Sequence, residues 1–176
     1  MQESTTGGHR RLVIVRHAKA EPTGATDHGR DLSDRGRADA EEAGRWLREQ
    51  GVVPDAALVS DARRTHETWL HLALGAGWDV EPGLSPALYA AGPDAARDLV
   101  RETGAGVGTL VVVGHNPTMA YVAELLDDGD GDDDATTDMV VAGFPPASVA
   151  VFDVACGWGD LDAGAGRLTG FHVGSA

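Results

Sequence analysis

The stretch LVIVRHAKAEP, Leu12 to Pro22, places four apolar residues directly before an Arg-His pair. An apolar run without alternation is typical of a strand that is buried on both faces of a sheet. Arg16 and His17 therefore follow the carboxyl end of a buried strand. Ligands of open α/β sheets bind at the carboxyl ends of the strands, so this pair is a candidate binding or catalytic site.

Further apolar runs recur along the chain, at residues 56–59, 110–113, 147–154 and, more weakly, 167–173. Stretches with helical spacing lie between most of these runs, and they are expected to begin after Ser33, after Ser60 as an N-cap, near Pro93 and at Pro117. Strands that alternate with helices predict an α/β fold, a three-layer α/β/α sandwich around a largely parallel central sheet.

The chain of 176 residues, 42% of them hydrophobic, suits one globular domain, which we place at residues 11–176. Residues 1–10 are polar and without periodicity, and we expect a disordered tail there. The acidic run DDGDGDDD, Asp127 to Asp134, is expected to be a solvated loop insertion. It lacks the central Gly and the final Glu of a calcium loop, and no His pair has zinc-ligand spacing, so we expect no metal and no cofactor.

The formal net charge is −14, from 28 acidic and 14 basic residues. This charge argues against nucleic acid or an anionic membrane as a partner, and any anionic ligand needs a local cationic cluster. No apolar run approaches the roughly 20 residues of a membrane helix, and the first residues lack the apolar segment of a signal peptide. With Cys156 as the single cysteine, these features indicate a cytoplasmic protein without an internal disulfide.

Two other strand ends also carry cationic or titratable side chains. The strand that ends at Ser60 leads into DARRTHET, which contains Arg63 and Arg64, and TLVVV is followed by GHNPT, which contains His115. Guanidinium groups donate paired hydrogen bonds to phosphate oxygens, and helix N-termini after these strands add backbone donors. The sequence therefore predicts a site for a tetrahedral oxyanion.

A His residue at such a site has a specific chemical use. A neutral imidazole can attack phosphorus and carry the phosphoryl group as a covalent intermediate. A second imidazole, if protonated, would stabilise the charge that the phosphoryl oxygens carry in the transition state. The combination of two His and two Arg residues therefore indicates phosphoryl transfer.

The chain resembles the histidine phosphatase (phosphoglycerate mutase-like) superfamily in three motifs. They are RHA at Arg16 to Ala18, the pattern Ser-x-x-x-Arg-Ala-x-x-Thr at Ser60 to Thr68, and Gly-His at Gly114 and His115. Thr65 replaces the usual Ala of the second motif. The motifs follow the expected order over residues 12–126, and they imply a phosphoglycerate mutase-like fold. Within the superfamily, RHAKAEP, LSDRG, ALY and VVVGHNPT are most similar to the SixA-type phosphohistidine phosphatase branch.

This resemblance implies a role for each matching residue. His17 is the expected nucleophile, Arg16 and Arg64 bind the phosphoryl group, and His115 completes the pocket. Arg64 is preferred to its neighbour because it is the residue four positions after the motif's Ser. Lys19 is either a contact at the pocket rim or a solvated charge, and Arg35 lies in a segment that is near the pocket rim in this branch. Both are candidate substrate contacts.

The chain departs from the superfamily at the proton donor. Mutases and ester phosphatases carry a Glu in a segment similar to Glu-x-x-Tyr, whereas this chain has PALY, with Pro86 in place of the acid. A basic alkoxide leaving group needs a positioned acid, whereas the imidazole of phosphohistidine leaves neutral once it is protonated. Glu21, Glu81 and Asp94 are possible substitutes for the acid.

We therefore expect a metal-independent phosphatase that acts through a phosphohistidine intermediate on a phosphohistidine protein or another activated phosphate. A small-molecule phosphomonoesterase or mutase with an unrecognised acid is an alternative. A third possibility is a regulatory module that binds phosphorylated proteins without turnover. The expected partners are a phosphorylated protein or a small phosphate.

Overall fold

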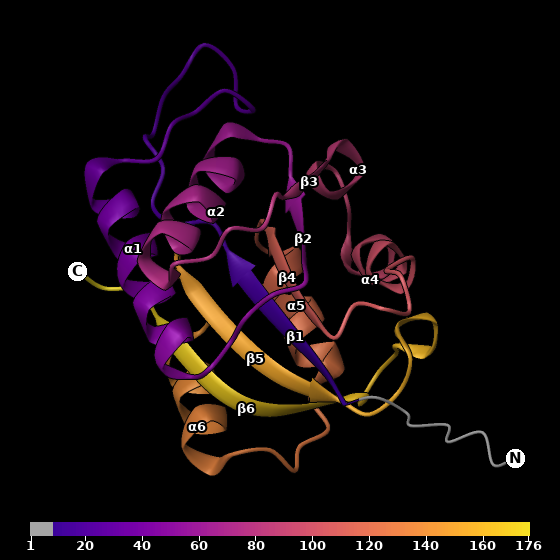
Figure 1. Cartoon of the computed structure of the whole chain (residues 1–176). Helices are drawn as coiled ribbons and strands as arrows, with labels where there is room; N and C mark the ends of the chain where they lie inside the picture. The colour runs from indigo at the N-terminus through magenta and orange to yellow at the C-terminus, as the bar shows by residue number, and fades with distance from the viewer. Residues whose placement is uncertain (1–8) are drawn as a thin grey trace, which may run out of the picture.

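The structure is a computed structural model that describes residues 9–176. These residues form a six-stranded sheet with helices on both faces (Figure 1). The strands are β1 (Arg10–Arg16), β2 (Ala56–Ser60), β3 (Gly83–Ser85), β4 (Thr109–Gly114), β5 (Ser148–Val154) and β6 (Gly166–Val173). The helices are α1 (Asp34–Glu49), α2 (Arg63–Ala76), α3 (Pro86–Tyr89), α4 (Pro93–Arg101), α5 (Thr118–Leu126), α6 (Asp133–Ala142) and the 3-10 helix η1 (Trp158–Asp160).

The strand order in the sheet is β3-β2-β4-β1-β5-β6. The first four strands in this order run parallel to one another, and β5 pairs antiparallel with both β1 and β6. The expected three-layer sandwich with a largely parallel sheet is therefore confirmed. The carboxyl ends of β2, β4 and β1 lie side by side at one edge of the sheet.

Apolar and polar residues do not alternate in β1 because helices cover both faces of the sheet. Val13 and Val15 pack into one apolar cluster with α1 and α2. Leu12 and Ile14 point to the opposite face and pack into a second cluster with α4, α5 and α6. Each side chain of the run is fully buried, as expected for a central strand that is covered on both sides.

Helices α1 and α2 approach each other closely on the first face. A Cβ atom added to Gly44 of α1 would lie 2.2 Å from the carbonyl oxygen of Leu72, and one added to Gly75 of α2 would lie 2.0 Å from that of Glu41. Each glycine thus makes room for the backbone of the other helix. This contact sets the distance between the two helices.

The helix starts are partly as expected. Ser33 caps α1 by accepting a hydrogen bond from the backbone N–H of Gly36, α4 begins at Pro93, and α5 begins one residue after Pro117. The prediction that Ser60 caps the second helix is wrong. Helix α2 begins at Arg63 without a side-chain cap, because the hydroxyl of Ser60 is engaged elsewhere.

Two segments differ from the expected organisation. Residues 1–8 of the expected tail lie outside the described residues, while Arg10 already belongs to β1. The acidic run joins α5 to α6, and its last three residues belong to a helix terminus. Asp132 caps α6 by accepting from the N–H of Ala135 at 2.8 Å, and the next two carboxylates occupy the first turn, where they favour the helix dipole.

Two searches of the described residues, 9–176, give negative results. No helix in this part of the chain is both long and apolar enough to cross a membrane. Within the same residues, no group of three or more His, Cys, Asp or Glu side chains is placed to hold a metal ion.

Candidate active site

The carboxyl ends of β1 and β4 bring the two motif histidines together. The N–H of His17 donates to the carbonyl of Gly114, the last residue of β4, at 3.0 Å. His115 follows that residue directly, and the centroids of the two imidazole rings lie 5.4 Å apart. The neighbouring strand β2 ends beside them and leads into α2, which carries Arg64. Arg16, His17, Arg64 and His115 are thus gathered at one edge of the sheet.

The ring of His17 is oriented by its own backbone neighbour. Its Nδ1 lies 2.7 Å from the carbonyl oxygen of Ala18. A carbonyl oxygen only accepts, so Nδ1–H donates and the lone pair of the neutral ring is on Nε2. Burial, together with the positive charges of Arg64, Arg16 and Arg30, lowers the pKa of His17 to about 4 against the opposing effect of that hydrogen bond. At neutral pH this imidazole is uncharged and nucleophilic.

His115 is oriented by Ser60, which is fully buried. The Nε2 of His115 lies 2.7 Å from the Ser60 hydroxyl, which also accepts a longer 3.4 Å hydrogen bond from the N–H of Ala62. The hydroxyl can donate its proton to Nε2, and in that tautomer the ring proton is on Nδ1. Burial, followed by the charge of Arg64 and the proximity of His17, lowers the pKa of His115 to about 3. A neutral His115 can thus donate through Nδ1–H without being protonated.

Three buried nitrogens at this edge lack a hydrogen-bond partner among the described residues: Nε of Arg16, Nε of Arg64 and Nδ1 of His115. Buried donors without a partner are uncommon in folded proteins and need an explanation. Arg16 and His115 lie at the ends of β1 and β4, and Arg64 lies in the first turn of α2. The three groups are candidate donors to an oxyanion beside His17.

The two motif arginines are held by backbone carbonyls. Arg16 donates from Nη1 to the carbonyl of Phe144 at 3.0 Å, and Arg64 donates from Nη1 to the carbonyl of Asp27 at 2.7 Å. Thr68, the last residue of the second motif, links α2 to the nucleophile. Its hydroxyl donates to the carbonyl of Arg64 at 2.7 Å and accepts from the N–H of Ala18 at 3.0 Å.

The structure separates the adjacent arginines, as the motif spacing predicts. Arg64 points into the site with 7% of its side chain exposed. Arg63 is 63% exposed and forms ion pairs with Asp31 and, at 3.3 Å, with Glu67. Only Arg64 is placed to bind an anion beside His17.

Lys19 and Arg35 are not brought together with the other site residues. The guanidinium of Arg35 is 74% exposed and lies 3.7 Å from the carboxylate of Asp39, its neighbour on α1. The Lys19 side chain is exposed, while its backbone carbonyl accepts from both the N–H and the hydroxyl of Ser33. These contacts give the segment around Ser33 a role in fixing the loop that follows β1.

Sequence reasoning missed Asp27, which lies in that loop. Its Oδ2 accepts from Nη2 of Arg64 at 3.2 Å and from the hydroxyl of Tyr89 at 2.5 Å, and its Oδ1 accepts from Nε of Arg30 at 3.2 Å. The Tyr89 hydrogen bond is the largest cause that lowers the pKa of Asp27, to about 2, with help from Arg64 and Arg30. The hydrogen bond to Asp27 in turn raises the pKa of Tyr89. The loop has no periodicity, so the sequence carries no signal for this contact.

The acids proposed from the sequence do not take this position. Glu21, Glu81 and Asp94 are all exposed, and Pro86 is the exposed first residue of α3. Tyr89, from the same short helix, also packs edge-on against the ring of His115 at 5.4 Å between centroids. Asp27 is thus the carboxylate that contacts both Arg64 and Tyr89.

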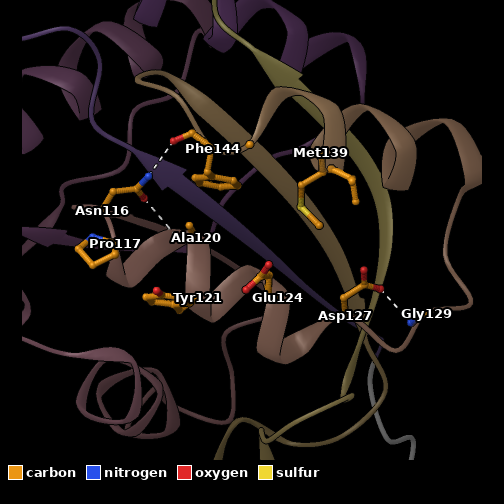
Figure 2. A pocket seen from close by; sticks show the side chains of 11 residues that line it. Asn116, Pro117, Ala120, Tyr121, Glu124, Asp127, Gly129, Met139 and Phe144 are labelled. Carbon is orange, nitrogen blue, oxygen red and sulfur yellow. Dashed lines mark hydrogen bonds between the residues drawn. The ribbon is translucent and has the colours of Figure 1, made fainter.

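A groove with a volume of about 820 Å³ begins next to His115 and runs between α5 and α6 (Figure 2). Asn116 lies at its near end, where its side-chain amide donates to the carbonyl of Phe144 at 2.8 Å. That carbonyl also accepts from Arg16, so one wall of the groove is bonded directly to the candidate site. Apolar and acidic side chains line the groove: Pro117, Tyr121, Met139, Phe144, Glu124 and Asp127.

Comparisons with known proteins agree with this geometry. The sequence pattern of the histidine phosphatase superfamily (branch 1) matches residues 12–89. A protein of Mycobacterium tuberculosis strain H37Rv, described as uncharacterised, is 39% identical over 160 residues, which cover 90% of this chain and 99% of that protein.

Two solved structures extend the comparison. A protein from Nakamurella multipartitia, provisionally described as phosphohistidine phosphatase SixA, matches with a TM-score of 0.82 at 30% identity, over 96% of this chain and 98% of its own. A second protein with the same provisional description, from Agrobacterium tumefaciens, gives a TM-score of 0.76 at 26% identity, over 93% and 97%. The likeness extends over nearly the whole chain and so includes all the motifs.

Proposed function

Because this chain belongs to the histidine phosphatase superfamily, and within it to the SixA-type branch, we propose that it is a metal-independent phosphatase with His17 as nucleophile. The observation that carries the proposal is the set of buried, unpartnered donors on Arg16, Arg64 and His115 in front of a neutral imidazole. Such a set stabilises the oxygens of a transferring phosphoryl group.

The reaction then has two displacements. In the first, Nε2 of His17 forms a bond to phosphorus while the bond from phosphorus to the leaving group breaks, and the leaving group keeps the electron pair. Arg16, Arg64 and the Nδ1–H of His115 donate to the phosphoryl oxygens throughout. In the second, a water molecule attacks phosphorus on the opposite side from Nε2. The bond to Nε2 breaks, and inorganic phosphate leaves with His17 restored.

We propose phosphohistidine in a protein, or another activated phosphate, as the substrate class. The position where ester phosphatases of the superfamily carry their acid holds Pro86 in this chain, which supports this proposal. A site without a positioned proton donor suits a substrate whose leaving group needs little help. The adjoining groove offers room for polypeptide next to the phosphorylated side chain.

A small-molecule phosphatase is the second candidate, since a groove of about 820 Å³ is also large enough for the rest of a small phosphate ester. The two candidates differ in the leaving group. A phosphohistidine phosphatase should hydrolyse a phosphohistidine peptide much faster than an unactivated ester such as glycerol 3-phosphate. Equal or better turnover of the ester would favour the small-molecule candidate.

The test of the mechanism is to trap the phosphoenzyme. Rapid quenching with base during turnover of a phosphohistidine peptide or of p-nitrophenyl phosphate should yield an acid-labile, base-stable phosphoprotein. The His17→Ala variant should lose this species, and its kcat should fall on the order of 10⁴-fold or more. His9→Ala, at the opposite end of β1, is the matched control and should keep both. A phosphoenzyme that persists in His17→Ala would overturn the assignment.

A further inference from the structure

We propose that Asp27 selects substrates with a cationic leaving group, because its carboxylate lies on the leaving-group side of the pocket and accepts a hydrogen bond from the N–H of a phosphohistidine ring. This inference rests on the proposed function and deepens it. It assigns to one side chain the preference for nitrogen-linked over oxygen-linked phosphate.

The first argument is that the carboxylate is held in place by donors from three separate parts of the chain. Arg64 comes from α2, Tyr89 from α3, and Arg30 from the loop after β1. The side chain of Asp27 is nevertheless 56% exposed, so part of the carboxylate still faces solvent at the pocket mouth. A group that is fixed in position and accessible on one side is suited to contact a ligand.

The second argument is the direction in which the leaving group departs. The proposed nucleophile and the unpartnered donors of Arg16 and His115 lie at the ends of β1 and β4, and that of Arg64 lies in the first turn of α2. These groups form the floor of the site. In an in-line displacement the leaving group is on the opposite side of phosphorus from Nε2 of His17, and so it points away from the sheet. Figure 1 shows the loop after β1 and α3 beyond the strand ends, and the hydrogen bond from Tyr89 to Asp27 joins them there.

The third argument is charge. The hydrogen bond from Tyr89, together with Arg64 and Arg30, holds the pKa of Asp27 at about 2, so the group is an anion at neutral pH and does not serve as a proton donor. An anion beside the leaving group repels a departing phenolate or alkoxide and attracts a cation.

Phosphohistidine matches this charge in its reactive form. Its ring is cationic when the nitrogen that does not carry the phosphoryl group is protonated. When the P–N bond breaks, its electron pair stays on the leaving nitrogen, and the ring departs as neutral imidazole with its proton still on the other nitrogen. No proton has to be delivered to the leaving atom. Asp27 needs only to accept a hydrogen bond from that N–H, which is a charge-assisted interaction.

The experiment compares two kinds of leaving group in wild type and Asp27→Asn. We would measure kcat/KM for a phosphohistidine peptide, for the small compound phosphoimidazole and for p-nitrophenyl phosphate, together with inhibition by inorganic phosphate. Asp27→Asn should lower kcat/KM for both nitrogen-linked substrates relative to p-nitrophenyl phosphate by at least about tenfold, the usual size of one charge-assisted hydrogen bond. Phosphate inhibition should change less than about threefold, because the donors on the floor remain.

Two variants control for charge and for folding. Asp34→Asn removes the same charge from a fully exposed side chain at the start of α1 and should leave the substrate ratio unchanged. Asp27→Glu keeps the carboxylate and should keep a preference for nitrogen-linked substrates. Circular dichroism of each variant shows whether the fold is retained.

Every other outcome overturns the inference. If Asp27→Asn lowers kcat/KM equally for all substrates and weakens inhibition by phosphate, Asp27 only positions Arg64. If the ratio does not change, it has no part in selecting the leaving group. Failure of the proposed function has a different signature, since wild type itself would then hydrolyse neither the peptide nor phosphoimidazole.

Discussion

His17 is neutral at physiological pH, and this state is set by its surroundings. Burial and three nearby arginines disfavour the imidazolium, while the hydrogen bond to Ala18 fixes the tautomer that leaves Nε2 unprotonated. A free histidine would be partly charged near neutrality and to that extent unable to attack phosphorus. A neutral ring with an unprotonated Nε2 is the state that the proposed attack on phosphorus requires.

The pH dependence of turnover follows from this pKa. The neutral form of His17 is the reactive one, so activity should be fully present above about pH 5 and should fall as the pH drops through about 4. The measurement is kcat for p-nitrophenyl phosphate from pH 3.5 to 8, with recovery on return to pH 7 as the check against unfolding. An acid limb centred between pH 6 and 7 would show that His17 is not shifted as described.

Single residues also show how far the site could be predicted. The resemblance to the family motif preferred Arg64 to Arg63, and of the two side chains Arg64 is the buried one. Asp27 could not be found, since two of its three donors, Arg64 and Tyr89, come from distant segments, and its loop has neither periodicity nor a motif. Arg35 was chosen by analogy, and its ion pair with Asp39 does not connect it to the other site residues. Lys19 was left open between a rim contact and a solvated charge, and its side chain is exposed.

Among the elements, the buried strands were the easiest to predict, because a continuous apolar run leaves few alternatives. The prediction for α2 began too early, since Ser60 has the side chain of an N-cap but uses it on His115. The three-residue β3 and the four-residue α3 were missed because such short elements carry no periodic pattern. Helix α6 was missed because its first residues belong to the acidic run.

The contact between α1 and α2 gives a prediction about stability. Gly44→Ala would place a methyl group 2.2 Å from a backbone oxygen of α2, so the two helices would have to separate. We expect a loss of about 1–3 kcal/mol of unfolding free energy, although alanine favours a helix more than glycine does. Urea unfolding with an unchanged m-value is the measurement. Gly104→Ala, where nothing lies within 4 Å of the added Cβ, should be nearly neutral, and equal losses in the two variants would contradict the argument.

At the scale of the whole molecule, the two apolar clusters share the central strands. β1, β4 and β5 contribute alternate residues to both, so neither cluster can be lost while the other stays intact. The net charge of −14 indicated that any anionic ligand must bind where the few cationic side chains cluster.

Unfolding should therefore be a single cooperative transition. Trp158 reports on the face covered by α4 and α5, and Trp69 on the face covered by α1 and α2. Trp158→Phe leaves fluorescence mainly from the second face, and its urea midpoint should coincide with the midpoint from circular dichroism of the same variant. Separate midpoints would show that the layers unfold independently.

The carbonyl of Phe144 has a consequence for inhibitor design. It is bonded on one side to Arg16 and on the other to Asn116, at the near end of the groove between α5 and α6. Phosphatase inhibitors that imitate phosphate must carry its charge, and this limits their entry into cells. If the groove holds the substrate as proposed, an uncharged compound that fills its apolar part and bonds to Asn116 would hinder substrate binding next to His115. An inhibitor that binds in the groove would therefore not have to carry the charge of a phosphate group.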